Sequence, residues 1–105
     1  VKQDFVEAKK WFDRAQGRYS WADYWLGLMY MYGNGVSIDY SKAMEYSMNA
    51  AEQNVNYAQE NVALMYLNGW GVEKNFDTAA RWYVKAAQNG LSTAQKWCRT
   101  NGIDY

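Results

Sequence analysis

The chain has 105 residues and a mass of 12.2 kDa, which suits one domain and is too short for two. Eleven Lys and Arg balance eleven Asp and Glu, so the formal net charge is zero. A basic surface is the usual footprint of a nucleic-acid-binding protein, and this balance argues against one. No apolar run approaches the length that spans a bilayer. We therefore expect neither a nucleic-acid partner nor a membrane span.

The chain also contains no histidine and a single cysteine, Cys98. Without histidine, neither a Ser–His or Cys–His nucleophile pair nor a histidine-ligated metal site can form. A single cysteine cannot form an internal disulfide, and we expect Cys98 to be buried and inert. The composition therefore predicts a protein that is not an enzyme and has no catalytic residue, metal or cofactor. A lone thiol favours the cytoplasm, with the periplasm left open if a signal peptide has been removed.

A repeat runs along the chain, and its period is the 36 residues from Ala22 to Ala58. Residues 22–57 align without a gap on residues 58–93, and a third copy begins at Ala94. The identical positions include Ala22 and Ala58, Tyr30 and Tyr66, Gly33 and Gly69, Gly35 and Gly71, Val36 and Val72, Ala43 and Ala79, and Ala50-Ala51 and Ala86-Ala87.

This register predicts a single domain over residues 1–105. It comprises a half repeat (1–21), two full repeats (22–57 and 58–93) and a partial repeat or C-terminal cap (94–105). Because the chain starts inside a repeat, we interpret it as a fragment of a longer array or as a small protein that begins with half a repeat. Both ends of such a stack leave apolar surface, so self-association through the open ends is a further expectation.

Each repeat is predicted to form two helices. The first spans about 22–32, and about 58–68 in the second copy, because Ala22, Leu26 and Tyr30 recur at the spacing of one helix face. We expect about six helices in all, the last of them short, and no strands.

Residues typical of helix ends separate these elements. The Gly-Asn-Gly stretch at 33–35 tolerates the left-handed conformation that ends a helix. Asp39 and Asn75 are good N-caps for the second helix of each repeat, and Asn54 and Gly90 are expected to end those helices.

From Ala22 to Ala51 the chain reads Ala-x3-Leu-Gly-x2-Tyr-x2-Gly-x-Gly-Val-x2-Asp-x3-Ala-x6-Ala-Ala. This pattern closely resembles the Sel-one-like repeat, a family of tetratricopeptide-type α-solenoids, and the resemblance covers essentially the whole chain. The second copy departs from it at Val62-Ala63, and the third departs more, at Trp97-Cys98-Arg99. The resemblance implies an all-α, right-handed α–α superhelix of helix–turn–helix repeats that binds other proteins.

Solenoids of this family present a concave surface lined by the first helix of every repeat, and the resemblance places a second, largely apolar stripe on that face. Aromatic residues and Met are enriched at interface cores. The expected partner-binding residues are Trp21, Tyr24, Leu28, Met31 and Tyr32 in the first full repeat, and Tyr57, Glu60, Leu64, Leu67 and Asn68 in the second. Thr93 and Lys96 hold the same positions in the third. The alternative is packing between helices, and Leu28 and Leu64 favour it most.

Trp70 is a separate case, because it lies inside the second Gly-x-Gly loop, where the first repeat has Asn34. A tryptophan there either folds back as a staple or contacts a partner, and we include it among the partner-binding candidates.

Three functions remain open from the sequence. The leading hypothesis is a non-catalytic protein–protein interaction module whose protein or peptide partner lies on the concave face. The second is a small bacterial immunity or inhibitor protein that neutralises a dedicated toxin. The third is an architectural segment of a longer repeat array.

Overall fold

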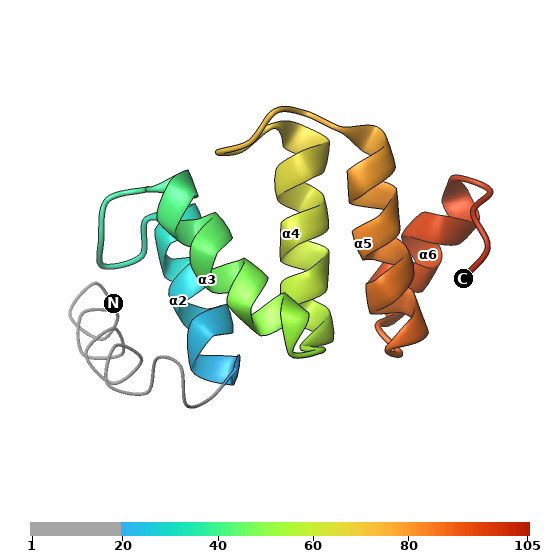
Figure 1. The fold of residues 1–105 in the computed structure, drawn as a ribbon, viewed down its shortest axis with the longest axis horizontal. Coiled ribbons are helices and arrows are strands. Elements are labelled where there is room, and N and C mark those ends of the chain that lie inside the picture. The colour runs from blue at the N-terminus through green and yellow to red at the C-terminus, as the bar shows by residue number, and fades with distance from the viewer. Residues whose placement is uncertain (1–19) are drawn as a thin grey trace.

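The computed structural model describes residues 20–105, and these residues form five helices and no strand (Figure 1). The helices are α2 (Ser20–Tyr32), α3 (Tyr40–Glu52), α4 (Asn56–Asn68), α5 (Phe76–Gln88) and α6 (Ser92–Thr100). The all-α prediction is confirmed, and α2 and α4 each begin two residues before the predicted start. The sixth predicted helix, in the half repeat 1–21, lies outside the described residues.

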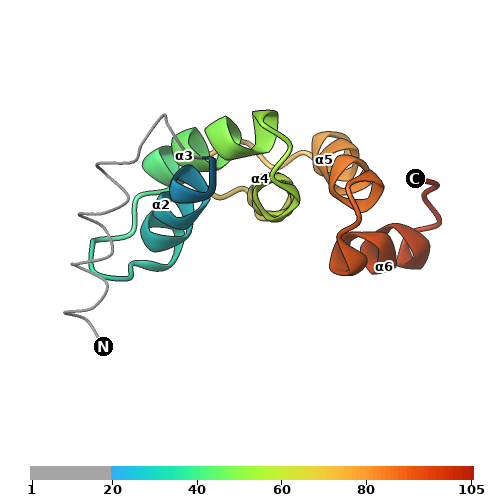
Figure 2. The same cartoon turned by 90° about the horizontal axis from the view of Figure 1, so that it is seen from below.

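The helices stack in a row of hairpins. Helix α2 packs on α3 and α4 packs on α5, while the contacts of α3 with α4 and of α5 with α6 join successive repeats. Figure 2 shows two layers, with α3 and α5 on one side and α2, α4 and α6 on the other. The row arches so that α2, α4 and α6 lie on its inner side, and we call them the inner layer.

The helix ends form as the sequence indicates. Asp39 Oδ1 accepts a hydrogen bond of 3.1 Å from the Lys42 amide, and Asn75 Oδ1 accepts one of 3.1 Å from the Thr78 amide. These side chains satisfy amide groups that a helix leaves without partners. Asn54 has a φ of 66°, in the left-handed region, where a helix commonly ends. The local signals in the sequence therefore fix where each repeat turns.

Alanines allow the helices to approach closely. Fully buried alanines occupy three pairs of equivalent positions in successive repeats: Ala43 and Ala79, Ala50 and Ala86, and Ala58 and Ala94. Gly27 makes a still closer contact, because a Cβ there would lie 3.2 Å from the Ser47 amide nitrogen and 3.3 Å from the Ala43 carbonyl oxygen. Small residues at these contacts leave room for Leu26, Val62 and Met65 to fill the core between helices.

A buried glutamine connects three helices. The Gln59 side chain of α4 is 1% exposed, and its Nε2 donates a hydrogen bond of 3.1 Å to the Ala51 carbonyl at the end of α3. Its Oε1 accepts one of 2.9 Å from Asn89 Nδ2 at the end of α5. The next repeat reproduces the first of these bonds, because Gln95 Nε2 donates to the Ala87 carbonyl at 3.0 Å. The glutamine thus sets how α4 sits against α3 and α5.

Tyr83 of α5 provides the main contact with the last helix. Its ring stacks on that of Trp97 in α6, with centroids 4.0 Å apart and planes 15° from parallel. Burial raises the pKa of Tyr83 to about 12, and the nearby Glu60 and Cys98 add to the increase. The folded protein therefore favours the protonated, uncharged form of the Tyr83 side chain.

Replacing Gln59 with Leu is expected to lower the free energy of unfolding by about 1–3 kcal/mol, because its side chain would lose both the hydrogen bond to the Ala51 carbonyl and the one from Asn89 Nδ2. Urea denaturation measures this change as a shift of the midpoint when the m value is the same for both proteins. The matched control is Gln88→Leu, at an exposed position at the end of α5, which should leave the midpoint nearly unchanged. Equal midpoints for wild type and Gln59→Leu would contradict this role.

Alkaline pH should destabilise the fold through Tyr83. Its pKa is raised from 10.0 to about 12, so the unfolded chain loses this proton first, and stability falls as pH rises from about 10 to 12. The effect is on the order of 2–3 kcal/mol. Urea denaturation near pH 9 and pH 11 should show a smaller loss of stability for Tyr83→Phe than for wild type. Tyr32→Phe, at an exposed tyrosine, should behave as wild type, and an unchanged loss in Tyr83→Phe would refute the assignment.

Candidate functional site

Four aromatic side chains gather on α2 and α4, two helices of the inner layer. We call Trp21, Tyr24, Trp25 and Tyr57 the aromatic patch. The Trp21 and Tyr24 ring centroids are 5.6 Å apart with planes at 89°, and Tyr57 of the next repeat lies 6.0 Å from each of them. The Trp25 ring lies 5.3 Å from Tyr24. The patch therefore bridges two successive repeats.

The patch stays in contact with solvent although its rings touch one another. Trp21 is 51% exposed, and Trp25 and Tyr57 are each 46% exposed. Tyr24, in the middle, is half-buried. Burial is the largest cause that raises its pKa, and the nearby Tyr57, Glu60 and Tyr32 raise it further. Partly exposed aromatic clusters of this kind provide large contact areas for protein partners.

Polar side chains continue the surface from α4 to α6. The Thr93 hydroxyl of α6 donates a hydrogen bond of 2.6 Å to Glu60 Oε2 of α4. Both residues hold positions of the predicted stripe. Together with the aromatic patch they join all three helices of the inner layer along one line.

The predicted site residues differ in exposure. Trp21, Tyr32, Tyr57 and Asn68 are exposed, and Tyr24, Leu28 and Glu60 are half-buried. Asn68 is engaged locally, because its Nδ2 donates to the Leu64 carbonyl at 3.0 Å. The structure brings Trp21, Tyr24, Tyr57 and Glu60 together.

Three other predicted positions lie in the core or pack against it. Met31 is 2% exposed and packs in a core cluster with Tyr30, Ala43 and Met65, so it is not a surface residue. The reason is that α2 packs against more than one neighbour and buries more of its circumference than a single face. Leu64 and Leu67 are half-buried and pack against the core cluster around α5 and α6. This position of Leu64 agrees with the alternative expectation, in which its side chain packs between helices.

Trp70 folds back onto its own chain. Its ring stacks on Tyr40, at the start of α3, with centroids 5.7 Å apart and planes 9° from parallel. Gly71 beside it permits this close approach, since a Cβ there would lie 2.7 Å from the Tyr40 Cβ. The staple interpretation therefore applies to Trp70, which joins the loop after α4 to the start of α3 in the preceding repeat.

Trp25 belongs to the patch but is absent from the predicted stripe. The corresponding positions in the next repeats are Asn61, which is 7% exposed, and Trp97, which is half-buried and stacked on Tyr83. The repeat pattern by itself would assign Trp25 to a covered position. Its exposure depends on what lies beside α2, which no local signal in the sequence reveals.

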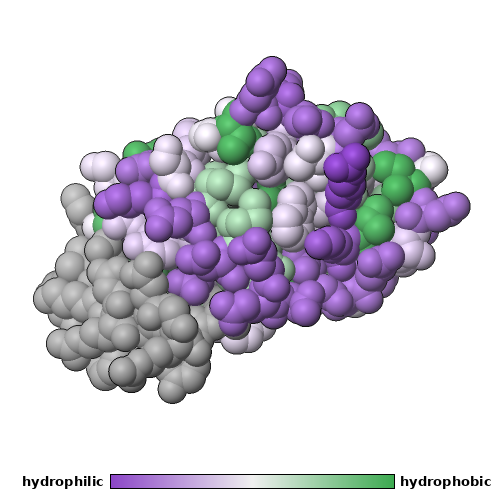
Figure 3. Space-filling view, viewed as in Figure 1, coloured by the Kyte–Doolittle hydropathy of each residue, from purple (hydrophilic) through white to green (hydrophobic). Residues whose placement is uncertain are grey.

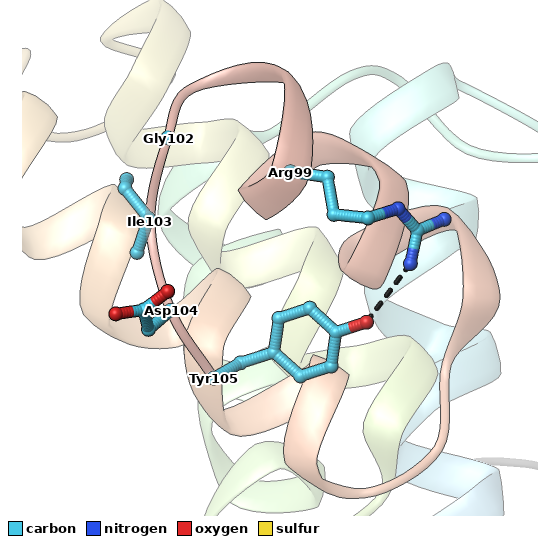
Figure 4. A pocket seen from close by; sticks show the side chains of 5 residues that line it. All are labelled: Arg99, Gly102, Ile103, Asp104 and Tyr105. Carbon is cyan, nitrogen blue, oxygen red and sulfur yellow. Dashed lines mark hydrogen bonds between the residues drawn. The ribbon is translucent and has the colours of Figure 1, made fainter.

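The outer face, formed by α3 and α5, and the C-terminal end of the chain are weaker candidates for a binding site. Figure 3 shows the side formed by α3 and α5, which is mostly hydrophilic over the described part of the chain. At the C-terminal end, a depression is lined by Arg99, Gly102, Ile103, Asp104 and Tyr105 (Figure 4). Arg99 Nη1 donates to the Tyr105 hydroxyl at 2.9 Å there, and the Asp104 carboxylate points away from this pair.

Residues 20–105 contain no group of His, Cys, Asp or Glu side chains that could hold a metal ion. Over the same residues, no helix has the length and apolar character to cross a bilayer. Cys98 is fully buried, and burial raises the pKa of its thiol, which keeps it in the unreactive protonated form.

The family model of the Sel1 repeat matches residues 1–15, 22–55 and 56–91. Among solved structures, a Sel1 repeat protein from Oxalobacter formigenes is 31% identical with a TM-score of 0.83, covering 90% of this chain and 28% of that one. A protective antigen present in uropathogenic Escherichia coli strains, with the SLR fold, is 29% identical with a TM-score of 0.83. That match covers 93% of this chain and 22% of the antigen. No curated protein matches significantly.

This chain thus spans less than a third of either solved relative. Within that span the agreement includes the sequence repeats, the paired helices and their stacking into a solenoid. The chain belongs to the Sel1 repeat family, whose repeats generally act as protein–protein interaction modules.

Proposed function

We propose that this protein is a non-catalytic interaction module that binds a protein or peptide through the aromatic patch and the adjoining inner layer. The observation that carries this proposal is the cluster of Trp21, Tyr24 and Tyr57, whose rings contact one another across two repeats while Trp21 and Tyr57 stay about half exposed. Contiguous apolar surface of this kind is a common mark of a binding site. Trp and Tyr are also the residues most enriched at binding hot spots.

A macromolecular partner fits this surface better than a small metabolite. Small-molecule sites are concave pockets that enclose most of the ligand, whereas stacked repeats create extended open surfaces. The patch spans α2 and α4, and the Glu60–Thr93 hydrogen bond continues the surface to α6. An extended segment lying across the three helices would use the whole of it.

The same test also distinguishes two other functions, one narrower than this proposal and one that would replace it. A dedicated inhibitor of one target, such as an immunity protein that blocks a toxin, would bind one partner tightly through the patch. An architectural segment would hold its neighbours through the solenoid ends and would not need the patch at all.

The double variant Trp21→Ala/Tyr57→Ala should lose partner binding while keeping its helicity and thermal midpoint, because both side chains are about half-exposed. One hot-spot truncation costs about 2 kcal/mol or more, so a loss of at least thirtyfold in affinity is expected. Affinity capture from the native lysate, with quantitative mass spectrometry and circular dichroism on the same preparations, measures both properties.

The matched control is Phe76→Ala/Tyr105→Ala, which removes two aromatic side chains of similar exposure away from the patch. It should capture the same proteins as wild type. Equal losses in the two double variants would contradict the assignment of binding to the patch. A toxin captured by the wild type and the control but lost from Trp21→Ala/Tyr57→Ala would specify the inhibitor function.

A further inference from the structure

We propose that the aromatic patch recognises an arginine side chain of the partner, whose guanidinium stacks on Trp21 or Tyr57 and hydrogen-bonds to Glu60. This inference rests on the proposed function and specifies the chemistry that the partner presents.

The charge of α2 and α4 favours a cationic partner. The two helices contain no Lys or Arg, and their only charged residues are Asp23 and Glu60. Asp23 is 1% exposed, whereas Glu60 is accessible at the surface. The cations of the inner layer are on α6, at Lys96 and Arg99. The patch is therefore an electron-rich surface with a carboxylate beside it.

In the aromatic patch, a guanidinium can lie on the outer face of a ring but cannot fit between two rings. A flat cation held between two parallel rings needs about 7 Å between them, twice a normal carbon contact. The Trp21, Tyr24 and Tyr57 centroids are 5.6–6.0 Å apart with planes inclined by 39–89°, so no such slot exists among them. A guanidinium would instead lie flat against an exposed ring face, the usual geometry of arginine on Trp or Tyr.

Glu60 is held ready to take part in this contact. The Thr93 hydroxyl occupies one lone pair of Oε2 and so orients the carboxylate, which has further acceptor sites, including those of Oε1. The charge of Glu60 contributes to the raised pKa of Tyr24, which agrees with a carboxylate close to the rings. Arginine offers a planar fork of donors to a carboxylate and a flat surface to a ring, whereas lysine offers only a point charge.

Cations already cover aromatic rings elsewhere in this chain. Lys42 Nζ lies 5.2 Å from the centre of the Tyr30 ring, and Lys85 Nζ lies 4.8 Å from that of Trp82. Each is supplied by α3 or α5. Since α2 and α4 supply no cation of their own, a cation above the patch can come from a partner.

The test is a titration of the 15N-labelled protein with an acetylated, amidated pentapeptide that has a central arginine between serine and glycine residues. Amide and indole shifts report where it binds. We expect millimolar binding with the largest shifts at Trp21, Tyr57 and Glu60. The same peptide with citrulline, which keeps the planar shape without the charge, should bind at least about fivefold more weakly. A peptide with glutamate in place of the arginine should cause no shift at the patch.

Two variants separate the contribution of the Glu60 carboxylate from that of the Trp21 ring. Glu60→Gln should weaken arginine-peptide binding about tenfold, because a hydrogen bond to a charged acceptor is lost. Its control is Glu52→Gln, at an exposed carboxylate at the end of α3, which should bind as wild type. Trp21→Ala should also weaken binding while the amide spectrum stays folded.

Equal affinity for the arginine and citrulline peptides, or wild-type affinity in Glu60→Gln, would overturn the inference. No shift at the patch at millimolar peptide would overturn it as well. The proposed function has its own readout: if Trp21→Ala/Tyr57→Ala loses a captured partner while the arginine peptide fails to bind, the patch is an interaction surface for a different chemistry. If both fail, both proposals are wrong.

Discussion

The hydrogen bonds of Gln59 fix how successive repeats sit against each other. One amide group binds the last turn of α3 and the cap of α5 at once, and it does so in a place that water does not reach. A single repeat cannot bury its own apolar face, so the solenoid exists only through contacts between neighbours. The alanines permit the approach, and the directional bonds of Gln59 select one register from the many that alanine surfaces would allow.

The aromatic patch depends on that register. Tyr57 lies one residue after the first residue of α4, two positions before Gln59, so the rotation that seats the glutamine between α3 and α5 also brings the Tyr57 ring to 6.0 Å from Trp21. Helix α2 buries Leu26 and Met31 against its neighbours and leaves Trp21 outside. The surface that we assign to partner binding is thus a consequence of packing between repeats.

Features that depend on neighbours in sequence could be predicted, and features that depend on neighbours in space could not. The caps at Asp39 and Asn75 and the helix end at Asn54 follow from local chemistry, and each forms as predicted. Met31 and Tyr32 are adjacent and both suit an interface, yet one is 2% exposed and the other 53%. Their side chains point about 100° apart on the helix, but the sequence does not show which direction is covered. Met31 packs with Met65 of α4, and the same limit hid Trp25.

Hydroxyl-radical footprinting of the protein alone and with its captured partner bound would test the central claim most directly. We predict that Trp21, Trp25 and Tyr57 are oxidised in the free protein and protected in the complex, while Phe76 and Tyr105, which are similarly exposed, react equally in both. Protection of Phe76 or Tyr105 with no change at the three patch residues would contradict the account, and would place the binding surface at the C-terminal end of the solenoid.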